Sequence, residues 1–195
     1  MAAPVAGTKR RRGRLFTGGL VAGALVAGAG LYWFQPWKLW QDTTVNEALP
    51  TAPAAAAPSG APSGAPSGAA APTGPAASAA TLAGGTFTSH EHATTGKAAL
   101  IRLPDGSHTL RLEGLETSDG PDLRVWLTDA PVLEGVAGWR VFDDGAHVSL
   151  GKLKGNKGDQ NYAIPADVNL AAYTSVTIWC DRFDVSFGAA ALTRV

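Results

Sequence analysis

Short runs in which apolar and polar residues alternate dominate the chain from about residue 84 to residue 195. In His108–Leu115, for example, Leu110 and Leu112 alternate with Arg111 and Glu113, the pattern of a strand with one buried face. Gly, Asp, Asn and Pro bound these runs, as is typical of short strands. The pattern predicts strands at residues 85–89, 97–103, 108–115, 123–128, 148–153, 162–164, 175–180 and 183–187.

Helical periodicity is weak throughout this region, so the pattern predicts an all-β domain. Many short strands at this spacing favour an antiparallel β-sandwich, with a partly closed barrel as the alternative. The turn Pro104–Ser107 is expected to join two of the strands into a hairpin. The irregular stretches 129–146 and 154–160 are expected to form loops at the ends of the sandwich.

An uncharged run, Leu15–Phe34, predicts a helix long enough to cross a bilayer, since about 20 residues span about 30 Å. One interpretation is a cleaved signal peptide, with Ala27-Gly28-Ala29 as the cleavage site. The other is a retained transmembrane anchor, favoured by aromatic residues suited to the membrane interface: Tyr32, Trp33, Phe34, Trp37 and Trp40. Basic residues before the run place the N-terminus in the cytoplasm and the C-terminal domain outside it.

Composition changes sharply after residue 49. Residues 50–82 consist mainly of Ala, Pro, Ser, Gly and Thr, which cannot bury enough apolar surface to fold, so they predict a disordered linker. The predicted organisation is a basic cytoplasmic tail (1–14), a transmembrane helix or signal anchor (15–34), a juxtamembrane segment (35–49), the linker (50–82) and a β domain (83–195).

The charge balance argues against a nucleic-acid partner. The whole chain has a formal net charge of zero, but from residue 83 onward fourteen Asp and Glu face ten Lys and Arg, a net charge of −4. Because binding to phosphates needs a basic surface, this part of the chain is unsuited to nucleic acid.

Cys180 is the only cysteine, so a disulfide within the chain is excluded. The two-residue period of a strand puts it on the same face as Val176 and Ile178. One interpretation is a buried, inert thiol that packs like a small apolar residue. The other is a functional thiol at a strand end, with the polar groups of Asp181 and Arg182 beside it.

Other candidate sites have weaker patterns. In an extended segment His90 and His92 would share a face and form a pair of metal ligands, or simply face solvent at a strand end. The acidic stretches 117–122 and 143–145 suit calcium but are equally typical of Asp-Gly turns. The chain lacks the Cys-x-x-Cys-His motif of c-type haem, the Cys-x-x-Cys redox motif, a Gly-x-Ser-x-Gly elbow and a phosphate loop. No metal ligands are assigned, and the sequence leaves open whether a haem or metal cofactor binds.

Several motifs in combination resemble the DM-thirteen domain, a family labelled electron transfer. The resemblance covers about residues 84–192 and rests on these motifs: Gly85-Thr86-Phe87, His92, Ser118-Asp119-Gly120-Pro121-Asp122-Leu123, Leu153-Lys154-Gly155-Asn156, Gly158-Asp159-Gln160-Asn161-Tyr162 and Trp179-Cys180. The resemblance implies a β-sandwich, with a DOMON-like arrangement as one form of it. In the family a characteristic cysteine is proposed as a redox centre, as a bare thiol or through a prosthetic group. That cysteine falls on Cys180 and the characteristic histidine on His92.

Two functions follow as hypotheses. The first is a membrane-tethered, extracytoplasmic electron-transfer module centred on Cys180 as a redox thiol. His92, Asp119, Asp181 and Arg182 are its candidate ligand-binding residues, and a separate molecule is its redox partner. The alternative is a non-catalytic β-sandwich that binds a cell-envelope ligand or an adhesion target. Neither hypothesis makes the chain a stand-alone enzyme.

Overall fold

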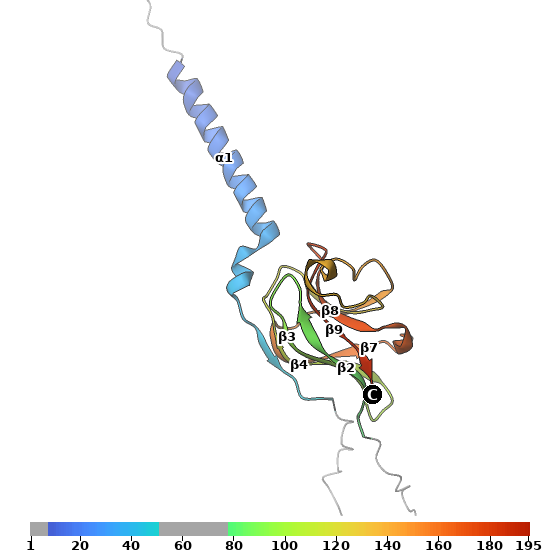
Figure 1. Cartoon of the computed structure of the whole chain (residues 1–195). Helices are drawn as coiled ribbons and strands as arrows, with labels where there is room; N and C mark the ends of the chain where they lie inside the picture. Colours follow the sequence, from blue (N-terminus) through green and yellow to red (C-terminus); the bar gives the residue numbers. More distant parts are fainter. Residues whose placement is uncertain (1–7, 51–77) are drawn as a thin grey trace, which may run out of the picture.

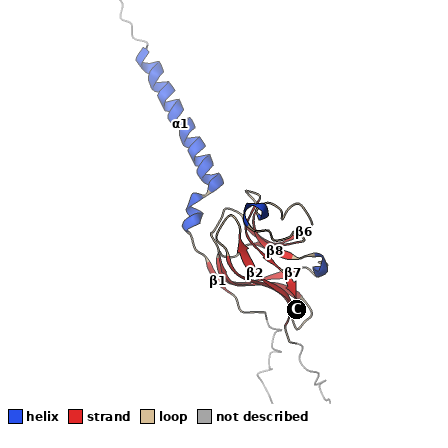
Figure 2. Ribbon diagram, in the orientation of Figure 1, coloured by secondary structure: helices blue, strands red, loops and turns tan. Residues whose placement is uncertain are grey.

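The computed structural model describes residues 8–50 and 78–195. A long helix, α1 (Thr8–Phe34), projects from a compact domain of strands, and a short 3-10 helix, Pro36–Trp40, connects the two (Figure 1). Apart from α1, the described chain is almost entirely strand and loop (Figure 2). The all-β prediction for the C-terminal domain is therefore confirmed.

The strands are β1 (Thr44–Asn46), β2 (Ala80–Ser89), β3 (Thr95–Arg102), β4 (His108–Glu116), β5 (Leu123–Thr128), β6 (His147–Lys152), β7 (Lys157–Ile164), β8 (Ser175–Cys180), β9 (Val185–Ala191) and β10 (Thr193–Arg194). They form one sheet in the order β1-β7-β4-β3-β2-β9-β8-β5-β6, and β10 pairs with β2. The predicted bounds of β5 and β8 agree with the structure.

The sheet is continuous and curls over a single apolar core. Strand β2 pairs with β3 through residues 80–86 and with β9 through residues 87–89, so it belongs to both halves. Leu100 and Leu112 from one half pack in the same cluster as Val125 and Ile178 from the other. A sandwich of two separate sheets, or a DOMON-like form of it, is not confirmed, because β2 carries the hydrogen bonding from one half into the other. The sheet is also mixed, since β1 runs parallel to β7.

Both faces of β8 are buried. Val176, Ile178 and Cys180 face the main core. Trp179, on the opposite face, packs with Trp126 and Phe142 in a second cluster. The second cluster exists because the long connection between β5 and β6, predicted as an end loop, lies over the outer face of the sheet. Alternation along β8 could not show that covering.

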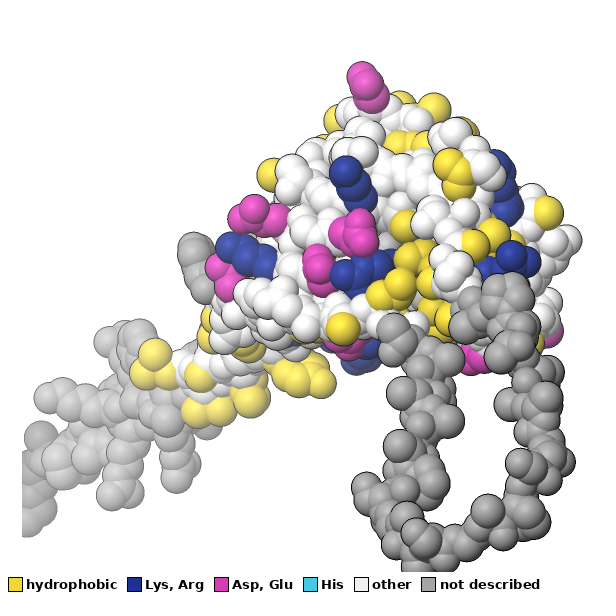
Figure 3. All heavy atoms as spheres, turned by 90° about the horizontal axis from the view of Figure 1, so that it is seen from below, with side chains coloured by type: hydrophobic (Ala, Val, Ile, Leu, Met, Phe, Trp, Pro, Cys, Tyr) yellow, Lys and Arg dark blue, Asp and Glu magenta, His cyan; other side chains and the backbone are white. Residues whose placement is uncertain are grey.

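Helix α1 begins before the predicted run and ends at Phe34, where the next residue, Gln35, has a left-handed backbone (φ 43°) and precedes Pro36. Among the described residues, no helix is both long and apolar enough to cross a membrane. The transmembrane helix predicted at residues 15–34 is therefore not supported by the described residues. Its exposed side chains include Leu20, Leu25 and Leu31, and Figure 3 shows apolar groups along the helix.

Two predicted boundaries need correction. The segment 35–49, expected along a membrane surface, contributes β1 to the sheet of the domain. Strand β2 begins at Ala80, so residues 80–82 belong to the domain and not to the predicted linker. The rest of the linker prediction, at residues 51–77, lies outside the described residues, as does the start of the basic tail at residues 1–7.

Candidate functional site

Cys180 ends β8 at a tight hairpin. Its partner across the hairpin is Val185, the first residue of β9. Asp184 closes the turn with a left-handed backbone (φ 49°), a conformation that Asp tolerates better than most residues. The hairpin fixes the cysteine at one end of the core.

The thiol of Cys180 has no solvent exposure. It lies in the apolar cluster with Ile178, Val185 and Phe187, and Phe183 packs against that cluster. Burial raises the pKa of the thiol, and hydrogen bonding by the backbone N–H groups of the neighbouring turn offsets only part of this effect. In this conformation Cys180 is a protonated, shielded thiol and not an open nucleophile.

A cavity of about 320 Å³ lies at this end of the core and brings two predicted residues together. His92 and Asp119 both line it. Its walls are largely aromatic, because Phe34, Phe183 and Phe187 also line it. Phe187 belongs to the cluster that holds Cys180, and Phe183 packs against that cluster, but Cys180 itself does not line the cavity. The volume is at the lower end of the range for small-ligand sites.

His92 is the polar group best placed for chemistry in the cavity. Its imidazole lies on the ring of Phe187, with 3.9 Å between centroids. Its Nε2 is 3.8 Å from a carboxylate oxygen of Glu91. Burial lowers the pKa of His92, and the carboxylate of Glu91 opposes this shift. The ring is therefore neutral at pH 7, the form that accepts a proton or coordinates a metal.

The end of α1 and the segment after it complete the cavity wall. Phe34 stacks on Phe183 with 5.8 Å between centroids. The ammonium group of Lys38 donates to the carbonyl of Gly120 at 3.2 Å and lies 4.0 Å from a carboxylate oxygen of Asp119.

The remaining predicted ligand-binding residues lie near the cavity without lining it. Arg182 donates to the carbonyl of Trp33 at 2.6 Å and lies over its indole ring, so it holds the helix end. Asp181 pairs with Nε of Arg124 at 3.1 Å and so fastens the hairpin to β5.

His90 has a different role from His92. The interpretation that both histidines face solvent is wrong for His90, which is buried. Its Nε2 donates to the carbonyl of Leu133 at 3.0 Å, and its Nδ1 lies 2.7 Å from the hydroxyl of Ser186. Because β2 ends at Ser89, the two histidines do not continue a strand, so the shared strand face expected for a ligand pair is absent.

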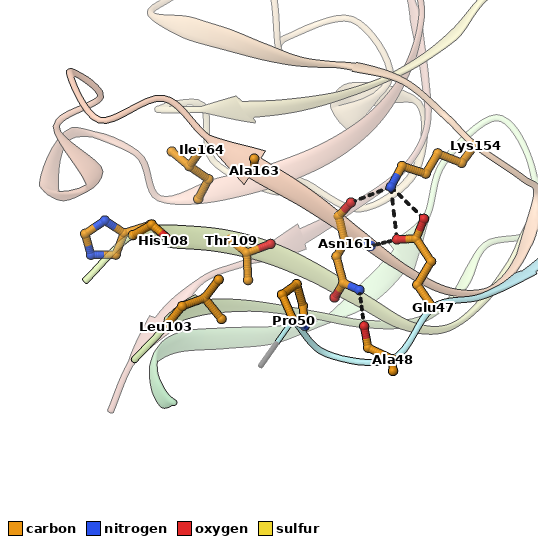
Figure 4. Close-up of a pocket in the computed structure, with 11 residues that line it drawn as sticks. Glu47, Ala48, Pro50, Leu103, His108, Thr109, Lys154, Asn161, Ala163 and Ile164 are labelled. Atoms are coloured by element: carbon orange, nitrogen blue, oxygen red, sulfur yellow. Dashed lines mark hydrogen bonds and ion pairs between the residues drawn. The ribbon is translucent and has the colours of Figure 1, made fainter. Parts of the chain in front are cut away.

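Two further observations concern ligands. Among the described residues, no group of three or more His, Cys, Asp or Glu side chains is arranged to hold a metal ion. A larger, open groove of about 580 Å³ lies where β4 begins and β7 ends. The residues that line it include His108, Thr109 and Asn161 (Figure 4). It contains none of the site residues predicted from sequence.

The family model described as "Electron transfer DM13" matches residues 86–192, more than half of the chain. The chain belongs to the electron transfer DM13 family. The DM13 match covers every strand from β3 to β9 and the whole cavity wall except residues 34–38. No curated protein and no solved structure matches the chain. Membership of the DM13 family supports a role in electron transfer or redox chemistry.

Sequence reasoning missed several of the residues that line the cavity beside His92. Glu91 lies between the two candidate histidines but was not singled out, and Lys38 lies in a segment that was assigned to a membrane surface. Phe183 lies in the turn before β9 and Phe187 lies within β9, and both pack in or against the main core. Nothing local in the sequence indicates that Phe34 would meet Phe183, since that contact depends on how α1 joins the domain.

Proposed function

We propose that this protein is an electron-transfer module whose site is the cavity beside Cys180. Membership of the DM13 family carries the proposal, and the geometry supports it. The cavity holds a neutral imidazole between apolar walls, and the chain's only thiol is buried in the apolar cluster to which Phe187 of those walls belongs. An apolar, partly closed site of this kind shields a reactive centre from water.

The two members of the site have distinct roles in this proposal. The sulfur of Cys180 does not line the cavity, so a prosthetic group or redox partner seated there meets His92 and not the thiol. His92 is the available nitrogen ligand or proton acceptor, and Asp119 and Lys38 set the charge at the rim. Cys180 is the proposed redox thiol. Its burial protects it from thiol–disulfide exchange with other molecules.

The test is a comparison of the full-length protein with Cys180→Ser and His92→Ala. Each is purified from the same host, and its visible spectrum, metal content and mass are recorded after treatment with dithionite and with ferricyanide. We expect a redox-dependent spectrum in the wild type, lost in Cys180→Ser and altered in His92→Ala. Asp167→Asn, an exposed change, is the control. Identical electron uptake in all four proteins would overturn the proposal.

We also propose that the module acts at the cell membrane, with the N-terminus in the cytoplasm and the DM13 domain outside. The basic residues before the uncharged run 15–34 and the aromatic residues at its end support this topology. Protease treatment of intact cells, followed by fractionation, tests it. Digestion of the domain in intact cells and recovery in the membrane fraction are expected; a protected domain in the soluble fraction would contradict the proposal.

A binding function is the second candidate, and the open groove of Figure 4 favours it. The groove is open and lined by hydroxyl, amide and imidazole groups beside apolar ones such as Leu103 and Ile164, a mixture that suits a cell-envelope polymer. Co-sedimentation with purified cell-wall material tests this function. Binding that Thr109→Ala and Asn161→Ala weaken, and that Cys180→Ser leaves unchanged, would separate it from the redox function.

A further inference from the structure

Strand β1 differs from every other strand in the way it joins the domain. It pairs parallel with β7, with Thr44 opposite Lys157 and Asn46 opposite Asp159. None of its three residues is buried. It therefore adds an edge strand without contributing to the core, and main-chain hydrogen bonds and polar side chains hold it in place.

Two carboxylates fasten the ends of this segment. Asp42 lies 2.9 Å from the ammonium group of Lys157 and accepts from the amide of Asn156 at 2.9 Å. Five residues later, both oxygens of Glu47 accept from the ammonium group of Lys154, at 2.7 and 2.9 Å (Figure 4). Hydrogen bonding, chiefly by Asn156 and by Lys154 respectively, lowers the pKa of Asp42 and of Glu47. Both side chains are therefore ionised at neutral pH.

Side chains of the domain also form hydrogen bonds with the main chain of the segment. The side-chain oxygen of Asn156 accepts from the backbone N–H of Thr43 at 2.7 Å. The side-chain amide of Asn161 donates to the carbonyl of Ala48 at 2.8 Å, and Arg111 donates to the carbonyl of Glu47 at 3.1 Å. These contacts depend on an extended backbone and not on a particular side chain.

Two glycines keep the edge of β7 open. A Cβ atom on Gly155 would collide with the carbonyl oxygen of Thr43 and lie 2.9 Å from a methyl group of Val45. A Cβ atom on Gly158 would collide with the carbonyl oxygen of Val45. The close approach of residues 42–48 therefore needs glycine at both positions.

We propose that the edge of β7 is a strand-binding site for an extended acidic segment, and that residues 42–48 occupy it as a tethered ligand. The ligand class is a peptide with carboxylates five residues apart and an extended backbone between them. Addition of such a strand to a sheet edge is a general mode of peptide recognition. The binding groups are Arg111 and residues 154–161, all within the DM13 match, whereas the ligand lies outside it.

The tether explains why the site is filled in the intact chain. Linkage in one molecule gives the segment an effective concentration in the millimolar range, so a free peptide competes poorly. When the chain's own segment is disabled, the same sequence added from outside should bind.

The experiment uses the full-length protein and a fluorescent peptide with the sequence of residues 41–49. Asp42→Lys/Glu47→Lys disables the chain's own segment and leaves the binding groups intact. Fluorescence anisotropy should show peptide binding to this variant at least about tenfold tighter than to the wild type. A peptide with the same two charge reversals should not bind, and adding Gly155→Ala to the variant should abolish binding.

Val45→Pro is a second way to release the segment, since proline cannot donate to the sheet. Circular dichroism confirms folding of each variant. Folded proteins with a released segment that do not bind the peptide would overturn the proposal, as would binding that Gly155→Ala leaves unchanged.

Discussion

The imidazole of His92 lies on the ring of Phe187, with 3.9 Å between the ring centroids. His92 follows β2 and Phe187 lies within β9, the two strands through which the halves of the sheet join. The contact therefore places the neutral imidazole at the seam of the fold, directly over the apolar cluster that contains Cys180. The free energy of unfolding therefore depends on the protonation state of His92.

Stability should fall as the solution becomes mildly acidic. Burial lowers the pKa of both His90 and His92 in the folded protein. The unfolded chain therefore takes up protons first as the pH falls below about 6.5, and the free energy of unfolding decreases between about pH 7 and pH 5. Urea denaturation at pH 7.5 and 5.5 measures this decrease in the free energy of unfolding.

His90→Asn and His92→Gln should each reduce the loss of stability between these two pH values. Asp42 and Glu47 also have lowered pKa values, but their contribution is lost only at more acidic pH. An unchanged pH dependence in both histidine variants would contradict this assignment.

The thiol of Cys180 should be nearly unreactive in the native protein. It is fully buried and its pKa is raised, so an aromatic disulfide reagent should label it slowly at pH 8 and completely after unfolding in urea. Rapid labelling of the folded protein would contradict the described packing.

Cys180→Ser should cost about 1–3 kcal/mol of unfolding free energy, because it buries a hydroxyl group in the apolar cluster. Cys180→Ala, which buries no polar group, is the matched control and should cost less. Urea denaturation of the three proteins separates the effect of polarity from that of volume. Equal losses in the two variants would show that polarity at this position is unimportant.

Release of residues 42–48 should expose the site. The 3-10 helix that carries Lys38 lies between α1 and β1, so undocking β1 removes one anchor of the cavity wall. Asp42→Lys/Glu47→Lys should therefore increase the rate of Cys180 labelling several-fold. Asp143→Lys/Asp144→Lys makes the same charge change at two exposed positions and is the control. Equal labelling rates in both double variants would show that release of the strand does not affect the cavity wall.

Gly188→Ala should destabilise the domain by about 1–3 kcal/mol through overpacking. A Cβ atom there would lie 2.7 Å from the methyl group and 2.8 Å from the hydroxyl group of Thr94. That hydroxyl bonds to Thr117 at 2.8 Å, so a shift of Thr94 disturbs a buried network. Gly84→Ala, where the nearest atom is at 3.4 Å, is the control in thermal denaturation. Equal midpoints would contradict the described packing.

The local pattern predicted most of the domain because each strand carries its own signal. Alternation and bounding turns located β5 and β8 and put Cys180, Val176 and Ile178 on one face. The pattern failed where burial comes from a distant segment. His90, just after β2, and Trp179, within β8, are buried because the connection between β5 and β6 folds over them, which no local periodicity can show.

The residues of the site likewise fall into those that the sequence identified and those that it missed. His92, Asp119 and Cys180 were identified by type and motif, and the structure places the first two in the lining of one cavity and the third in the apolar core cluster. Lys38 and Phe34 were missed because their role depends on contacts more than 80 residues away in the chain.

By itself, the sequence determined the all-β class, most strand positions and the family, since these depend on local alternation and short motifs. Only the tertiary structure decided that one curled sheet joins both halves through β2 and that Cys180 is shielded from the cavity. It also decided that residues 42–48 lie on the edge of β7. That segment has no buried residue of its own and is held by polar contacts with residues more than 100 positions later, among them Asn156 and, in β7, Lys157.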